Sequence, residues 1–266
     1  MSFSGFKRTM NRASTAVLQS VGAVDKTVDR QYDEEERRFL QLESNTNKLM
    51  TEARQYLDAL RAMSLAQQRI AESMTAFYDE QATLALCGIR FRDAMTQLDT
   101  SARADFDQRI RATFLEPLGR FISLYPSVKD HMKNRSNAML DYDSLRARVR
   151  RSAEKPDSDA TRLPRLEADC NAAKELYQRL NQELVEDLPR LIDSRVPYLD
   201  PSFSALAKAQ YSYYHSCATA TQPLTRFFER DHDMGVTDTS VPHARVNEAL
   251  ARMRELTIVR LAAQKG

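Results

Sequence analysis

Tryptophan is absent from this 266-residue chain, and glycine and proline are scarce, with 6 and 9 residues. Folds built from many short strands need glycine- and proline-rich turns about every ten residues, so β-sandwiches and Rossmann-type folds are excluded. The three cysteines, Cys87, Cys170 and Cys217, show no C-x-x-C spacing, which argues against a disulfide framework or zinc site and fits a reducing cytosol. No window approaches 18 uninterrupted apolar residues, so no segment is predicted to span a membrane.

Motifs of catalysis are missing as well. The four histidines lack metal-ligand spacing, and no G-x-S-x-G, phosphate-binding loop or dinucleotide fingerprint occurs. The string DYDS at 141–144 begins like a calcium-binding loop, but no glycine follows at the sixth position and no glutamate at the twelfth. We therefore expect no enzyme, no cofactor and no metal site. The polar segment 230–243 is expected to be a loop, followed by a final helix over 244–263 that packs on the rest of the chain.

One long segment contains no helix breaker: residues 23–87 hold neither glycine nor proline. As a single helix these 65 residues would extend for roughly 98 Å, about twice the diameter of a compact domain of this length. From Phe39 to Leu84 a heptad stripe advances by alternating steps of three and four, the pattern of helices that supercoil. We predict a dimer seam made by the apolar members of this stripe, namely Phe39, Leu42, Leu49, Tyr56, Leu60, Met63 and Ile70.

Two further long helices are expected to run back along the first. Helical periodicity covers about 91–151 and again 164–228, and the polar cluster 152–161 between them predicts a turn. Counted from this turn, Pro126 and Pro189 lie at nearly the same height in an antiparallel pair, as do Pro117 and Pro197. Prolines inside helices kink them, so we expect this hairpin to be curved. For Pro197 and Pro201 the alternative that they end a helix is equally open.

The first 24 residues contain no acid and form an amphipathic pattern. One face is apolar and the other is basic, as in helices that lie in a bilayer interface. A mitochondrial transit peptide and a helix packed on the core are the alternatives, whereas Ser2 excludes N-myristoylation. The residues expected to insert into a membrane are Phe3, Phe6, Met10, Val17 and Val21, and those expected to contact lipid headgroups are Lys7, Arg8 and Arg12.

Charge is distributed unevenly around the predicted turn. Residues 144–165 hold seven bases and three acids, whereas 166–200 hold four bases and eight acids. A basic turn beside an acidic shaft predicts binding to a polyanionic surface. Nucleic acid is the poorer candidate, because the bases are not interleaved with aromatic residues and the acidic shaft would repel phosphate. A solvated surface without a ligand is the remaining alternative.

Several segments together give the chain a resemblance to the N-BAR domains of the amphiphysin type, in a short form without an SH3 domain. They are the opening MSFSGFKRTMNRA, the segment DKTVDRQYDEEERR at 25–38, MLDYDS at 139–144, EDLPR at 186–190 and RVPYLDPSF at 195–203. The resemblance covers about residues 1–230. It implies an all-α, kinked antiparallel three-helix coiled coil that pairs into a curved dimeric six-helix bundle, preceded by the amphipathic helix.

The resemblance also implies a function. Residues 1–27 would be the membrane-inserting helix, 28–230 the BAR domain, and 231–266 a loop and short C-terminal helix. The dimer, either a homodimer or a heterodimer with an SH3-containing amphiphysin-like BAR protein, would bind anionic lipids such as phosphatidylserine and phosphoinositides. The resemblance places the lipid-binding residues at Lys129, Lys133, Arg135, Arg146, Arg148, Arg150, Arg151, Lys155, Arg162 and Arg165. Bases that amphiphysins carry just before DYDS are replaced here by Asn137 and Ala138.

The expected role is a scaffold that senses or generates membrane curvature in endocytosis, actin organisation, cell polarity and cell fusion. Its expected location is the cytoplasm, at the plasma membrane and cortical actin patches, with cortical actin machinery and no nucleic acid among its partners. The alternative is a cytoskeletal coiled-coil adaptor that does not remodel membranes. A straight coiled coil has little use for matched prolines or an acid-free amphipathic start, which favours the membrane scaffold.

Overall fold

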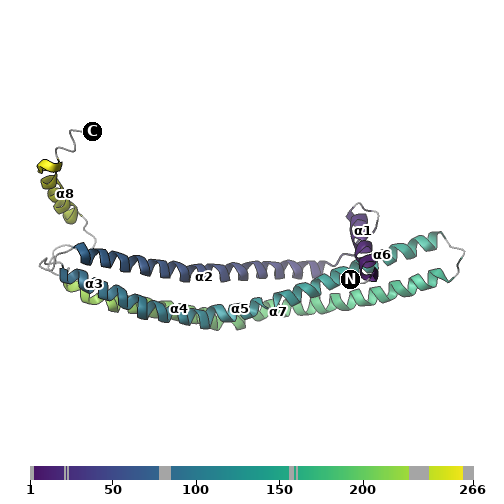
Figure 1. The fold of residues 1–266 in the computed structure, drawn as a ribbon. Helices are drawn as coiled ribbons and strands as arrows, with labels where there is room; N and C mark the ends of the chain where they lie inside the picture. Colours follow the sequence, from purple (N-terminus) through teal and green to yellow (C-terminus); the bar gives the residue numbers. More distant parts are fainter. Residues whose placement is uncertain are drawn as a thin grey trace. The chain divides into compact units, whose positions relative to one another are not determined.

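The computed structural model describes residues 3–20, 22, 24–77, 85–155, 159, 161–227 and 240–259, with side chains from Thr9 onward except at 240–243 and 245. Every element in these ranges is helical, which confirms the predicted all-α class. The elements are α1 (Phe3–Ser20), α2 (Arg30–Phe77), α3 (Ala85–Gln97), η1 (Leu98–Arg103), α4 (Ala104–Ile110), η2 (Arg111–Leu115), α5 (Glu116–Ile122), α6 (Tyr125–Glu154), α7 (Arg162–Thr221), η3 (Gln222–Phe227) and α8 (Ser240–Glu255) (Figure 1).

The chain divides into two compact units. The first unit contains residues 1–65 and 99–215, and the second contains 66–98 and 216–266. Helices α2 and α7 each contribute to both units. The N-terminal helix and the predicted basic turn both belong to the first unit.

Helix α2 starts at a capped end and stops before the sequence pattern does. The Asp29 carboxylate accepts hydrogen bonds from the backbone N–H groups of Gln31 and Tyr32, each 3.0 Å long, and so satisfies donors that the first turn leaves free. The helix ends at Phe77, and α3 begins at Ala85. The breaker-free run 23–87 is not one helix of 65 residues, because residues 24–29 lie outside any helix and α2 begins at Arg30. A lack of glycine and proline permits a helix, but packing decides where it ends.

Aromatic side chains form the core of the first unit. Phe39 on α2 meets Tyr125 edge to face with ring centroids 5.5 Å apart, and Tyr56 meets Phe106 in the same way at 5.8 Å. Phe114 contacts Phe203 of α7 at 5.7 Å. Each fully buried apolar side chain contributes about 2–3 kcal/mol to stability, so these layers hold α2, α4–α6 and α7 together within one chain.

The predicted dimer seam is therefore partly wrong. Phe39 is fully buried and Leu60 is 7% exposed inside the chain's own bundle, where they contribute to the core rather than to a free seam. Leu42, Leu49 and Tyr56 are half-buried. The remaining members of the stripe are exposed, with Met63 at 44% and Ile70 at 55%. The N-terminal part of the stripe is covered by other helices of the same chain, because those helices fold back along it.

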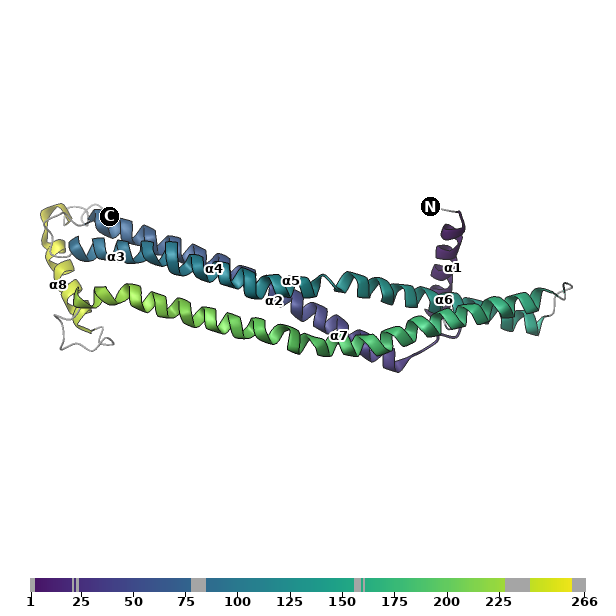
Figure 2. The same cartoon turned by 90° about the horizontal axis from the view of Figure 1, so that it is seen from below.

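Helices α6 and α7 form the expected antiparallel hairpin, with α6 ending at Glu154 and α7 beginning at Arg162 (Figures 1 and 2). The Tyr198 hydroxyl donates to the Pro117 carbonyl at 3.1 Å, and His131 lies opposite Glu183. This register places Pro117 beside Pro197 and Pro126 beside Pro189, as the sequence predicts. Pro189, Pro197 and Pro201 all lie inside α7, so the alternative that Pro197 and Pro201 end a helix is wrong.

The second unit contains the end of α2, α3, η3 and α8. Gly88 is buried, and a Cβ placed on it would lie 3.7 Å from the Thr75 backbone, so α2 and α3 approach closely there. Helix α8 does not behave as predicted. Its apolar side chains Val246, Leu250 and Met253 are 41–62% exposed, so the expectation that this helix packs on the bundle is wrong.

Candidate functional site

The N-terminal helix α1 lies against α6 through its polar side. The Arg12 guanidinium donates two hydrogen bonds to the Asp141 carboxylate, from Nε at 2.9 Å and from Nη2 at 2.7 Å. These bonds raise the pKa of Arg12 above its ordinary value, although burial opposes the shift. One turn further on, Thr15 is only 4% exposed, and Gln19 donates to Asp143 at 2.7 Å. The sequence predicts that Arg12 contacts lipid headgroups, but here its guanidinium is bound to the protein.

Asp143 is the centre of the junction between α1, α2 and α6. It is fully buried. Its carboxylate accepts the backbone N–H of Thr27 at 3.0 Å and the hydroxyl of Thr27 at 2.6 Å, in addition to Gln19, and it forms an ion pair with Arg146 at 3.1 Å. Arg146 also donates to the Asp25 carbonyl at 2.7 Å. The linker between α1 and α2 is thus fixed at several points.

The predicted membrane-inserting residues can be followed only in part. Met10 and Val17 are 59% and 62% exposed, on the side of α1 away from its contacts with α6. Val21 lies outside the described residues, and the side chains of Phe3, Phe6, Lys7 and Arg8 lie outside the described side chains. The described part of the apolar face is therefore open, as insertion into a bilayer requires.

Exposed bases follow along the outer end of the hairpin. Arg148, Arg150, Arg151, Lys155, Arg162 and Arg165 are all exposed. Arg150 forms ion pairs with Asp25 at 3.5 Å and Glu154 at 3.2 Å, and its side chain remains 72% exposed. We call the exposed set Arg148, Arg150, Arg151, Lys155, Arg162 and Arg165 the basic tip. It adjoins the α1 junction, because Asp25 of the linker contacts Arg150.

Arg135 requires a correction. The sequence assigns it to lipid binding, but it is 4% exposed. Its guanidinium lies 3.7 Å above the Tyr32 ring, donates to the Asn181 side-chain carbonyl at 2.8 and 2.9 Å, and donates to the Tyr177 hydroxyl at 3.3 Å. Asn181 in turn donates to Asp29 at 2.6 Å. Arg135 joins α2, α6 and α7, so its assignment to the lipid-binding set is wrong.

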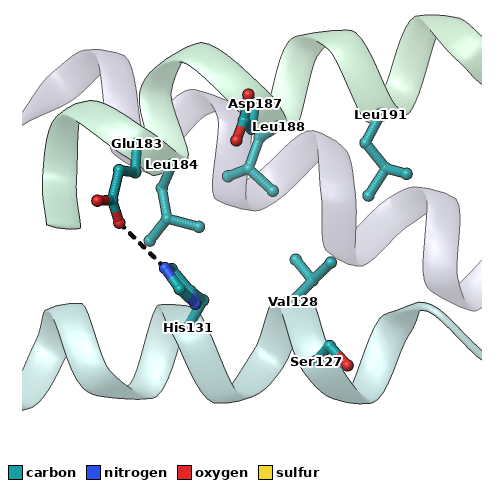
Figure 3. Close-up of a pocket in the computed structure, with 8 residues that line it drawn as sticks. All are labelled: Ser127, Val128, His131, Glu183, Leu184, Asp187, Leu188 and Leu191. Carbon is teal, nitrogen blue, oxygen red and sulfur yellow. Dashed lines mark hydrogen bonds and ion pairs between the residues drawn. The ribbon is translucent and has the colours of Figure 1, made fainter.

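The other two bases that the resemblance assigns to lipid binding in this part of α6 remain accessible. Lys133 is exposed, and Lys129 forms an ion pair with Glu43 at 3.1 Å while its side chain stays 53% exposed. A small groove lies close by between α6 and α7 (Figure 3). Val128, Leu184, Leu188 and Leu191 line it, and at one end the His131 ring meets Glu183 at 3.1 Å.

Two further kinds of site can be checked in the described residues. Among them no group of three histidine, cysteine or acidic side chains could hold a metal ion. None of the described helices is long and apolar enough to cross a membrane. The arrangement that stands out is an amphipathic helix held beside a row of exposed bases.

An antiparallel hairpin of long helices with a third helix packed along it is the fold of BAR domains. The BAR domain family model matches residues 6–227, so the chain belongs to this family. The match includes most of α1. The BAR family is one of structural scaffolds, not of enzymes.

Two relatives and one solved structure illustrate the similarity. It is 40% identical over 265 residues to Protein hob3 of Schizosaccharomyces pombe, with 98% of each chain covered. It is 35% identical over 269 residues to the Regulator of cytoskeleton and endocytosis RVS161 of Candida albicans, covering 98% of this chain and 99% of that one. The amphiphysin BAR domain from Drosophila shares the fold with a TM-score of 0.63 and 22% identity, covering 77% of this chain and 94% of that one.

The sequence did not show what the DYDS motif does. In the sequence analysis the motif serves only to mark the family resemblance. A calcium-binding loop is excluded because the required glycine and glutamate do not follow it. In the structure Asp141 and Asp143 hold α1 and the linker in place. Their spacing of two puts them on different sides of α6, which is a signal for two separate contacts and not for one ligand.

Proposed function

We propose that this protein is a membrane-curvature scaffold that binds anionic lipid through the basic tip and through α1. The observation that carries the proposal is that both features occupy one end of the first unit, because the linker from α1 contacts Arg146 and Arg150. Anionic headgroups would meet the exposed bases while Met10 and Val17 enter the acyl boundary. Lys129 and Lys133 would add to the same surface.

Binding strength argues for two copies. Each base near an anionic leaflet contributes about 1 kcal/mol, so one basic tip of six bases binds only moderately once ordering costs are subtracted. Two tips on one rigid particle bind much more tightly, because the second contact is intramolecular. We therefore propose that the chain acts as a dimer, with itself or with an SH3-containing amphiphysin-like BAR protein.

Exposed apolar side chains supply a surface for such a dimer. In the first unit Leu40, Met63 and Leu65 of α2 are 45%, 44% and 43% exposed. Monomers rarely leave so many large apolar side chains open. Sedimentation velocity of the full chain checks this proposal: a dimer at micromolar concentration supports it, and a monomer at that concentration contradicts it.

We further propose that the lipids are phosphatidylserine and phosphoinositides, that the protein acts in endocytosis and actin organisation with roles in cell polarity and cell fusion, and that it works in the cytoplasm at cortical actin patches of the plasma membrane. The name of the Candida albicans relative, a regulator of cytoskeleton and endocytosis, supports the cellular role. The match to the BAR family over residues 6–227 supports the membrane role.

The test is co-sedimentation with vesicles of phosphatidylcholine, with and without phosphatidylserine. The tip variant changes Arg148, Arg150 and Arg151 to Glu, and a matched control changes the equally exposed Arg120, Arg179 and Arg190 to Glu. We expect phosphatidylserine-dependent pelleting of the wild-type protein and the control, and at least a tenfold weaker affinity for the tip variant. If phosphatidylserine does not increase the pelleting of the wild-type protein, the result would instead support the alternative of a cytoskeletal adaptor.

A further inference from the structure

We propose that Asp141 and Asp143 are positioning residues that keep α1 attached to α6 while the apolar face of α1 enters the bilayer. In this view α1 is a fixed part of the scaffold and not a loosely tethered anchor. The inference rests on the proposed function for its membrane step. Its structural step, the attachment of α1 in solution, stands independently.

The attachment uses only the polar face of α1. Arg12, Thr15 and Gln19 follow one another at steps of three and four, so they lie on one side of the helix. All three are wholly or partly buried, and two of them bond to α6. At about 100° per residue, Met10 and Val17 lie roughly 170° away from the centre of this side. Attachment and insertion therefore use opposite faces of α1 and do not compete.

The contacts between α1 and α6 are strong enough to fix the position of α1 on α6. The Arg12–Asp141 pair is bidentate, and both side chains are about two-thirds to three-quarters buried, which reduces screening by salt. Asp143 is fully buried, so loss of its partners would leave a buried carboxylate unsatisfied. Its bonds to Gln19 and Thr27 secure both ends of the linker between α1 and α2.

The attachment has a consequence for charge. Because Asp141 neutralises Arg12, this base contributes little to headgroup binding, and the basic tip carries that task. Arg12 and Asp141 serve to orient the helix. An inserted helix that is rigidly joined to the bundle displaces lipid at a defined place relative to the basic tip, whereas a loose helix would only add affinity.

A charge exchange tests the structural step. The variants are R12D, D141R and the double variant R12D/D141R, which restores both the pair and the wild-type net charge. Hydrogen–deuterium exchange in the absence of lipid is measured over residues 9–20. We expect exchange to become at least tenfold faster in each single variant and to return toward the wild-type rate in the double variant. Unchanged exchange in both single variants would overturn the attachment. Circular dichroism on each variant verifies that the bundle remains folded.

The same variants test the membrane step. The readouts are pelleting with phosphatidylserine vesicles and tubule formation seen by electron microscopy. D141R adds a base, so we expect it to pellet at least as well as wild type yet to form several-fold fewer tubules, and the double variant to recover them. Faster exchange with undiminished tubulation would overturn the positioning role and leave the scaffold function intact. More tubules than wild type would overturn it too, because the attachment would then be inhibitory. Wild-type protein that fails to pellet would contradict the proposed function itself.

Discussion

The inner and outer halves of α6 carry the same residue type in opposite roles. In the inner half, Tyr125–Asp143, Arg135 is 4% exposed and is bonded to α7 beneath α2. In the outer half, Ser144–Glu154, Arg148, Arg150 and Arg151 are exposed. The difference lies in what covers the helix, because α2 and its linker extend only as far as Arg146 and Arg150. The linker contacts Arg146 and Arg150 in this half, yet the side chains of Arg148, Arg150 and Arg151 stay exposed and can meet a ligand.

The two halves of α6 should differ most in how much an arginine contributes to the free energy of unfolding. Arg135→Ala removes several hydrogen bonds from a charged donor and leaves the Asn181 carbonyl and the Tyr177 hydroxyl without it, so we expect a loss of about 2–4 kcal/mol in the free energy of unfolding. Arg148→Ala, at an exposed position, should change it by less than about 0.5 kcal/mol. Urea unfolding followed by circular dichroism measures both. Equal effects would show that the two halves do not differ as described.

A smaller effect concerns acid dependence at Asp29, the cap of α2, which Asn181 links to Arg135 of the inner half. Burial opposes it, but hydrogen bonds from Tyr32, Asn181 and Gln31, together with the charge of Arg135, lower the pKa of Asp29 below its ordinary value of 3.8. A lowered pKa in the folded state adds stability above the unfolded-state value, and this stability is lost as the pH falls through the folded-state pKa.

Asp29→Asn removes this contribution. The urea midpoint of the variant should therefore fall less steeply than that of wild type below about pH 4. Glu72→Gln, a change at an exposed position of α2, is the control for general acid effects. If the curves of the wild-type protein and the Asp29→Asn variant are parallel, Asp29 does not contribute in this way.

The smallest effect should come from exchanging the type of base. A lysine can meet a headgroup as a point charge, so Arg148→Lys should pellet with phosphatidylserine vesicles within about twofold of wild type. Arg135→Lys keeps the charge but loses the planar fork that reaches Asn181 and Tyr177, so its unfolding midpoint should still fall. If Arg135→Lys is as stable as wild type, the positive charge alone accounts for the contribution of Arg135 to stability.

The sequence was sufficient for the all-α class and for the α6–α7 hairpin, but not for the bounds of the individual helices. Periodicity and the polar cluster 152–161 predicted the α6–α7 hairpin, and the positions of Pro117, Pro126, Pro189 and Pro197 predicted its register. It was not sufficient for burial. Arg135 and Arg148 look alike in a list of bases, and only the tertiary cover by Tyr32 and Tyr177 distinguishes them.

The apolar patterns were ambiguous for the same reason. The heptad stripe of α2 predicted a dimer seam, yet Phe39 and Leu60 are part of the chain's own core while Met63 is exposed. The periodicity of an apolar stripe indicates that the stripe is buried. It does not indicate which helix buries it. The amphipathic pattern of α1 likewise gave its two faces, but not that the polar face would bind Asp141 and Asp143.

The measurement that tests the central claim most directly is electron microscopy of phosphatidylserine vesicles incubated with the full-length protein. The account predicts that wild-type protein converts them into narrow tubules, and that the variant with Glu at positions 148, 150 and 151 does so far less at equal concentration. Vesicles that stay spherical under a saturating coat of wild-type protein would contradict the claim that the chain is a curvature scaffold.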